Sequence, residues 1–328
     1  MKPARIPSTR RPLGLSPIVF GVACCIVSAF AYTAVNICLR FMSTQFDQVW
    51  VVCMKELMTV VIIAPWLLAQ AYRGRMVLPS TRLLVVLTVM GLLIQWAGNL
   101  PMIWAMSVVG LSITVPVALG TNLAFSAILG WLILRERITG ASAFAIALMF
   151  LSVVLFSLGA SRVSESITGT SVSTTMTILA VLAAVMAGTV FACLAIVIRR
   201  SVTGSTSPSM VVFMITFVGV ITLGPWSLYQ NGLEMLYEIP IRDHILMIVM
   251  GTLNLVGFIS VAKGLEMTTV AHVNVITASQ VAMGVVAGMM LFGEPASSWL
   301  ILGVCLAIAG IIIIRPAHEE EMEVSTGV

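Results

Sequence analysis

The pattern of apolar and polar positions divides the chain into long hydrophobic stretches separated by short polar segments. An α-helix needs about 20 predominantly apolar residues to cross a bilayer. Stretches of this length recur along the chain without the alternation of a barrel strand. We therefore predict an all-α integral membrane protein with ten transmembrane helices. Their predicted ranges are 17–40, 48–71, 82–106, 110–134, 138–160, 175–199, 208–230, 243–263, 268–292 and 296–315.

The last two predicted helices are joined by a tight corner, Gly293-Glu294-Pro295, and this layout occurs a second time near the middle of the chain. From Gly110 to about Ala160, two long helices again flank a charged corner, which here carries Glu136. One half of the protein is therefore predicted to be a copy of the other. The expected order is a basic N-terminal segment, a first five-helix repeat, a polar linker, a second five-helix repeat and an acidic tail, at residues 1–16, 17–160, 161–174, 175–316 and 317–328.

The composition agrees with a membrane protein and argues against nucleic-acid, metal and cofactor binding. Hydrophobic residues make up 59% of the chain and charged residues only 9%, whereas soluble domains carry about 25% charged residues. The net charge of +4 is spread over loops, so we expect no nucleic-acid partner. The six cysteines lie within predicted helices at spacings that match no zinc or haem motif, and we expect no metal or other cofactor.

Lysine and arginine residues indicate how the helices are oriented, because cytoplasmic loops of membrane proteins are enriched in them. With a cytoplasmic N-terminus, 13 of these residues fall on the inner side and three on the outer side, while Lys55 lies within a helix. Both termini are therefore predicted to be cytoplasmic. Because five is an odd number, the second repeat must be inverted relative to the first, as in many secondary transporters. This places Glu136 on the inner side and Glu294 on the outer side.

The second repeat carries residues that resemble the closing helices of an EamA-type unit, namely Gly288, Phe292-Gly293-Glu294, Trp299, Gly303 and Gly310. Two tandem five-helix units are similar to the ten-helix drug/metabolite transporter superfamily. The first half departs from the pattern, because Ala145 and Ser152 stand where the second half has its later glycines. The resemblance implies an alternating-access carrier with a central cavity between the halves, in a bacterial inner membrane. It leaves the substrate open among amino acids, sugars, nucleotide conjugates and drugs.

Polar side chains at bilayer depth are costly and are therefore candidates for lining a cavity. Superposing the two corners places Asn122 on Gln280 and Thr121 on Ser279, so the inverted repeats present an amide and a hydroxyl at equivalent depth. A substrate site at a repeat interface has this arrangement. The alternative is that the amides hydrogen-bond between packed helices. The candidates for the cavity wall are Tyr32, Asn36, Gln95, Trp96, Asn99, Thr121, Asn122, Asn254, Ser279 and Gln280.

A second group of residues is predicted to take part in coupling or gating. Lys55 and Glu56 are charged neighbours within the second helix, and because adjacent helical residues point about 100° apart we expect that they do not face one partner. They contact substrate or a gate, or else Lys55 snorkels to the outer surface and the charges pair locally. His272, near Asn274, is a candidate for proton coupling or an interfacial histidine. Pro116 removes a backbone donor, which predicts a break in the fourth helix beside a cavity.

These features favour a secondary transporter over other classes of membrane protein. The sequence has no Gly-x-Ser-x-Gly motif or metal cluster for an intramembrane enzyme, no phosphate-binding loop for ATP-driven transport, and no loop long enough for the soluble module of a sensor. We predict a carrier, not an enzyme, that exports or exchanges a small organic metabolite, neutral or zwitterionic. A membrane sensor or scaffold and a multidrug efflux carrier are the alternatives. The expected partners are this small molecule and the lipid bilayer, and a homodimer is left open.

Overall fold

The structure, a computed structural model, describes residues 17–74, 79–134, 140–168, 173–202, 207–267 and 270–313. These ranges are helical apart from turns and short connections, and no residue within them belongs to a β-strand. The predicted all-α fold is therefore confirmed for this part of the chain.

The helices follow the predicted ranges, and most of their ends differ from the prediction by a few residues. In chain order they are α1 (Pro17–Met42), α2 (Gln48–Tyr72), α3 (Thr81–Leu93), the π-helix η1 (Ile94–Asn99), α4 (Leu100–Val109), α5 (Leu111–Leu134), α6 (Gly140–Thr168), α7 (Thr174–Val202), α8 (Pro208–Asn231), α9 (Met235–Glu238), α10 (Ile241–Met267), α11 (Val270–Phe292) and α12 (Ser298–Ile313).

Within the described residues, eight helical segments are long and apolar enough to cross a membrane. One of them, Thr81–Val109, runs through α3, η1 and α4 as a single rod. Two further apolar segments, Ser279–Phe292 and Ser298–Ile313, are shorter. The chain is thus a multi-pass membrane protein.

The break in helical geometry occurs at a different proline from the one we predicted. α5 continues through Pro116 without interruption, whereas the third helix changes to a π-turn just before Pro101. Pro101 has no N–H to bond back into the preceding turn, and the N–H of Leu100 donates to the carbonyl of Gln95, five residues earlier. The break beside the cavity therefore lies in the third predicted helix.

α6 is longer than the sequence indicated. It continues to Thr168, so the first part of the segment that we predicted as a linker is helical. A Ser- and Thr-rich composition favours a loop, but serine and threonine are tolerated in a helix that packing supports.

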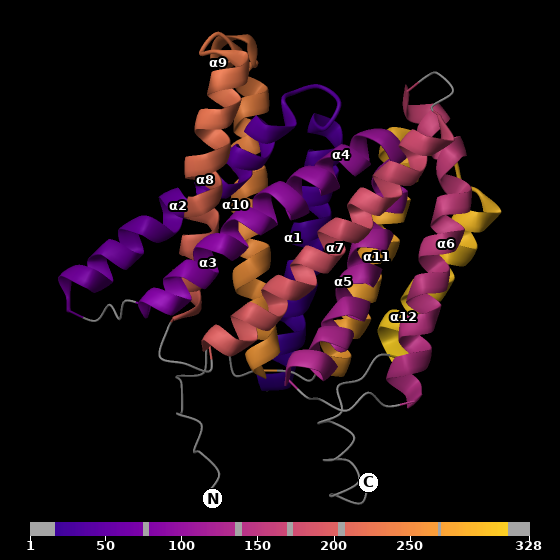
Figure 1. Ribbon diagram of the computed structural model, residues 1–328, viewed down its shortest axis with the longest axis horizontal. Helices are drawn as coiled ribbons and strands as arrows, with labels where there is room; N and C mark the ends of the chain where they lie inside the picture. Colours follow the sequence, from indigo (N-terminus) through magenta and orange to yellow (C-terminus); the bar gives the residue numbers. More distant parts are fainter. Residues whose placement is uncertain are drawn as a thin grey trace, which may run out of the picture.

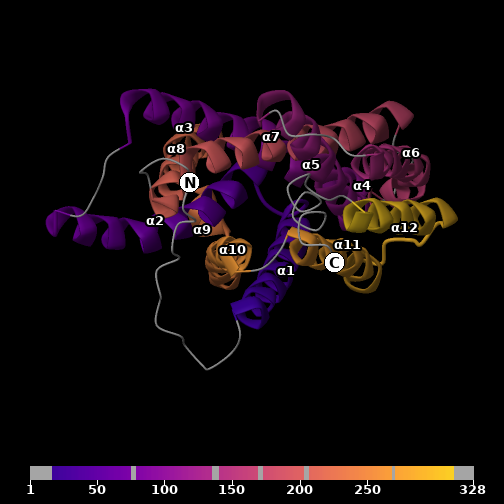
Figure 2. The ribbon, with the colours of Figure 1, turned by 90° about the horizontal axis from the view of Figure 1, so that it is seen from below.

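Helices of the two predicted halves are interleaved. α1 packs along α10, α5 along α7, α6 along α12, and α2 along α8, so each close pair takes one helix from each half. Seen along the bundle in Figure 2, α3, α7, α5 and α6 form one row and α10, α1, α11 and α12 form another, with α2 and α8 beside them. Neither half is a separate lobe.

The two ends of the bundle differ in their packing. We call the end that carries α9, at the top of Figure 1, the α9 end, and the end where α1 begins the opposite end. At the α9 end two large hydrophobic clusters join helices of both halves, and one of them includes Met42, Ile103, Leu111, Leu223 and Met247. Towards the opposite end the clusters of described apolar residues are smaller, and α2 and α3 lean outward there (Figure 1).

Candidate functional site

A central cavity of about 500 Å³ lies between the helices. Pockets for small molecules commonly measure about 300–1,000 Å³. Its wall takes residues from α1, α2, η1, α4 and α5 in the first half and from α7, α8, α10 and α11 in the second. Most of these residues are apolar, among them Phe191 and Phe258, and a smaller number of polar side chains interrupt them. The cavity is therefore built jointly by the two halves.

Several of the polar residues singled out in the sequence lie in this wall. Asn122 of α5 and Gln280 of α11, the amide pair related by the repeat, both line it. The other predicted residues in the wall are Tyr32, Asn36, Asn99 and Asn254, together with the charged pair Lys55 and Glu56. Amide groups both donate and accept hydrogen bonds, so the wall offers both functions to a solute.

Four other candidates lie outside the wall. Thr121 is buried where α5 passes close to Gly188 of α7. The ring of Trp96 is 39% exposed and meets Trp226 edge to face, with ring centroids 5.7 Å apart. Ser279 is exposed, and its hydroxyl donates to the carbonyl of Ile276 at 2.6 Å. Gln95 is fully buried behind Asn99.

Lys55 and Glu56 do share a partner, which corrects our expectation from helical geometry. The Lys55 Nζ donates to Asn99 Oδ1 at 2.9 Å, and the Asn99 Nδ2 donates to Glu56 Oε1 at 3.3 Å. The ammonium and the carboxylate also pair directly, with Nζ and Oε1 3.1 Å apart. Both side chains are long enough to turn toward Asn99 although their Cβ atoms diverge. Lys55 does not snorkel, because only 7% of its side chain is exposed.

The orientation of the Asn99 amide is fixed by its surroundings. Its Nδ2 also donates to Gln95 Oε1 at 2.7 Å, within the π-turn. Gln95 is in turn held against Gly219 of α8, where an added Cβ would lie only 2.7 Å from the Gln95 Nε2. Because Oδ1 faces an ammonium and Nδ2 faces two acceptors, reversing the amide would break all three contacts. Gln95 thus positions Asn99, and Asn99 holds the charged pair.

Two threonines in the wall escaped the sequence prediction. Thr59 lies one turn after Lys55, and its buried hydroxyl has no hydrogen-bond partner among the described residues. Thr216 of α8 also lines the cavity. A short repeat signal would have found it: Pro65-Trp66 in α2 matches Pro225-Trp226 in α8, and this alignment sets Glu56 on Thr216.

Some predicted coupling residues lie outside the described side chains. His272 and Asn274 lie in α11, but their side chains are not among those that the structure describes. Proton coupling through His272 therefore stays a prediction. Pro116 is buried within α5 and does not line the wall. Within the described residues, no group of His, Cys, Asp and Glu side chains is arranged to hold a metal ion.

Comparisons with known proteins agree with this architecture. The model of the EamA-like transporter family matches residues 19–158 and again residues 175–315, so two repeats cover most of the chain. A solved structure described only as a crystal structure of a protein is similar in fold, with a TM-score of 0.55 and 12% identity over 90% of this chain and 95% of that one. A search of curated proteins gives no match.

Proposed function

The chain belongs to the EamA-like transporter family, and from this we propose that it is a secondary transporter that moves a small organic metabolite by alternating access. Its ten membrane-spanning helices form two inverted five-helix repeats. The observation that carries the proposal is the central cavity, whose wall is shared between both halves of the chain. Carriers built from inverted repeats bind their solute at such an interface near the middle of the bilayer.

The charges of the wall favour a neutral or zwitterionic solute. Its charged side chains, among the described residues, are Lys55 and Glu56, which carry one positive and one negative charge. A solute with an unbalanced charge would be left without a counter-charge in a site of low polarity, which is costly. The amides of Asn122 and Gln280 and the unpartnered hydroxyl of Thr59 supply the remaining hydrogen bonds.

The proposed orientation determines which end of the cavity faces the cytoplasm. Both chain termini lie in the cytoplasm of a bacterial cell, and the α9 end faces outward across the inner membrane. Export or exchange of a metabolite then means that solute enters the central cavity from the opposite end. Membership of a transporter family argues against an enzyme.

Counterflow into liposomes tests the proposal. Purified protein is reconstituted in liposomes preloaded with one unlabelled solute, and uptake of the same labelled solute is followed for amino acids, sugars, nucleotides and amphipathic cations. We expect saturable counterflow for a neutral or zwitterionic class, its abolition by Lys55→Met, and its retention in Arg82→Gln, which replaces an exposed basic side chain of α3.

Each other outcome identifies a competing function. Counterflow confined to cations indicates a multidrug efflux carrier. No counterflow with any class, from protein that stays folded, contradicts a carrier and favours a sensor or scaffold.

A further inference from the structure

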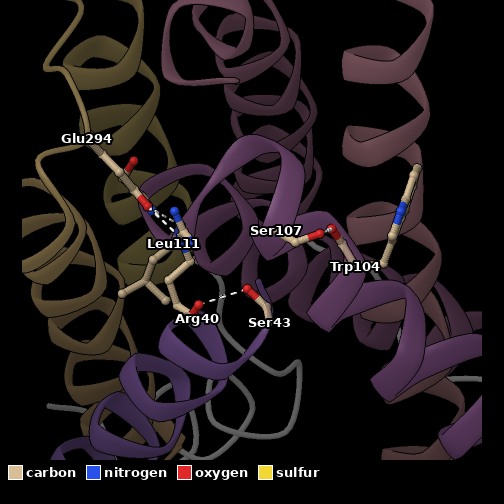
Figure 3. A network of polar contacts seen from close by, with 7 residues as sticks. Arg40, Ser43, Trp104, Ser107, Leu111 and Glu294 are labelled. Atoms are coloured by element: carbon tan, nitrogen blue, oxygen red, sulfur yellow. Dashed lines mark hydrogen bonds and ion pairs between the residues drawn. The ribbon is translucent and has the colours of Figure 1, made fainter. Parts of the chain in front are cut away.

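Glu294, at the corner between α11 and α12, is buried in a site made by the other half of the chain. Figure 3 shows its side chain reaching the first turn of α5, with Arg40 of α1 beside it. Its Oε1 accepts from the N–H of Leu111 at 2.8 Å and from Arg40 Nε at 3.1 Å, and its Oε2 accepts from the N–H of Ser112 at 2.8 Å. We call these contacts the Glu294 latch.

The surrounding backbone is shaped around this carboxylate. Gly110, just before α5, has a φ of 79°, and a Cβ there would lie 2.5 Å from Oε1. A Cβ at Gly288 of α11 would also overlap the carboxylate. Arg40 lies over the ring of Phe292, with its guanidinium carbon 5.1 Å from the ring centre. Two glycines and an aromatic platform thus leave space for one carboxylate at the positive end of a helix.

The Glu294 latch lies beside one end of the central cavity, whose wall includes Leu39, the neighbour of Arg40. It joins α1 and α5 to the corner that follows α11, at the α9 end, where the cluster around Met42 and Met247 also connects the halves. A second polar tie lies nearby, because the hydroxyl of Ser227 donates to Asp47 Oδ1 at 2.6 Å. The cavity extends the other way: its wall reaches Cys25 near the start of α1 and Val261 near the end of α10.

Opening the α9 end requires these contacts to separate. Two of the three donors are backbone N–H groups, so side-chain rotation of the donors cannot release Glu294, and α5 must move relative to α11. A buried carboxylate that loses its partners is strongly unfavourable unless water reaches it. Water entering an opened α9 end would supply that hydration. The latch is therefore stable in two arrangements, closed and dry or open and wet, with strained intermediates between them.

We propose that the Glu294 latch is the gate of the α9 end, and that each transport cycle breaks and re-forms it. This inference rests on the proposed transport function. The gate controls from which side of the membrane the cavity is reached, and it contributes no group to the cavity wall itself.

A cysteine reporter in the cavity tests the gate. Asn122→Cys is introduced into protein whose six native cysteines are replaced by alanine, and a membrane-impermeant sulfonated maleimide is added to either side of sealed vesicles. We expect labelling from the opposite end in the starting protein and slow labelling from the α9 end. Glu294→Gln should speed labelling from the α9 end about tenfold or more, because it lowers the free energy of the open arrangement relative to the closed one.

Matched variants separate gating from general loosening. Glu238→Gln replaces an exposed carboxylate at the same end and should leave labelling unchanged. Arg40→Gln leaves the two N–H donors in place and should give a smaller rise than Glu294→Gln. The Glu294→Gln protein could melt at a lower temperature and yet show unchanged labelling from the α9 end. This result would mean that Glu294 only stabilises the fold, and it would overturn the gate. A reporter that is unreactive from both sides would instead contradict the cavity, and with it the proposed function.

Hydrogen exchange in the otherwise unmodified protein covers the case in which these variants do not fold. The amides of Leu111 and Ser112 donate to Glu294 and should exchange through local opening, faster than amides in the middle of α5. Exchange as slow as that of the α5 middle would show that the latch opens only when the protein unfolds, and would exclude a gate.

Discussion

The molecule holds two buried ion pairs that are built in different ways. Arg40 and Glu294 have side-chain exposures of 7% and 0%, and Lys55 and Glu56 have 7% and 5%. Glu294 is held largely by backbone N–H groups of a distant helix, whereas Glu56 is held by its neighbour in the chain and by the side chain of Asn99. The exposed fractions are similar, so burial alone does not distinguish the two pairs.

The difference lies in what must move to release each carboxylate. Rotation of a few side chains frees Glu56. Glu294, in contrast, is enclosed by Gly110 and Gly288 and bonded to backbone N–H groups, so its release is linked to a shift of α5 against α11. Side-chain rotation is generally faster than the movement of whole helices, which takes microseconds to milliseconds. The pair in the cavity is therefore suited to respond to a solute, and the pair at the α9 end to report and control the arrangement of the helices.

The largest expected effect on stability comes from the α9 end. Glu294→Gln leaves the Arg40 guanidinium buried without a counter-charge, and removing one partner of a buried pair costs about 3–5 kcal/mol. Denaturant unfolding in detergent micelles measures this loss, with Glu238→Gln as the control. A loss below about 1 kcal/mol would place this pair with weakly coupled surface pairs and would contradict a special role for Glu294 at the α9 end.

The cavity pair should separate stability from function. Lys55→Met should cost about 1.5–3 kcal/mol, the usual contribution of hydrogen bonds to charged groups, and less than at the α9 end because Glu56 lines the cavity and keeps its bond from Asn99. Adding Glu56→Leu should recover most of that stability, since an apolar pair of similar size can replace an ion pair. Solute binding, measured by thermal shift, should stay lost in the double variant. Recovery of binding would mean that the charges serve packing and do not contact solute.

The smallest effect on stability is expected at Gln95, which supports the pair of Lys55 and Glu56 only indirectly, through Asn99. Gln95→Leu removes the acceptor for Asn99 Nδ2, and hydrogen bonds within membrane proteins contribute about 0.6–1.7 kcal/mol. Solute affinity should fall while maximal counterflow is kept, because Asn99 is loosened without loss of Lys55 or Glu56. Gln230→Leu, an exposed site in α8, is the control. A loss of stability with unchanged affinity would assign Gln95 to packing alone.

The sequence predicted the helices well because bilayer-spanning stretches are long and apolar. It could not tell which side of a helix faces the cavity. Ser279 and Gln280 differ by one position, yet the first is exposed and the second lines the wall. The polar positions of α11, among them Ser279 and Gln280, are spread around the helix, so they do not mark one face. Trp96 was likewise predicted to line the cavity, but it lies outside the wall and is partly exposed.

Contacts between distant segments were the other gap. The bonds from Glu294 to Leu111 and Ser112 span more than 180 residues, and nothing in the Gly293-Glu294-Pro295 corner indicates its partner. The π-turn had a local cause in Pro101, but Pro116 carried the same signal without producing a break. Whether a proline interrupts a membrane helix depends on neighbouring helices that the local sequence does not describe.

The interleaved pairing of the halves also constrains how the protein is made. Ser28 of α1 donates its hydroxyl to the carbonyl of Gly257 in α10, a partner that lies 229 residues later in the chain. At about 5–20 residues per second, a ribosome needs roughly 10 to 45 seconds to reach that partner. During this interval α1 is in the membrane with its packing face uncovered. Lipid or the insertion machinery must shield that face until synthesis is nearly complete.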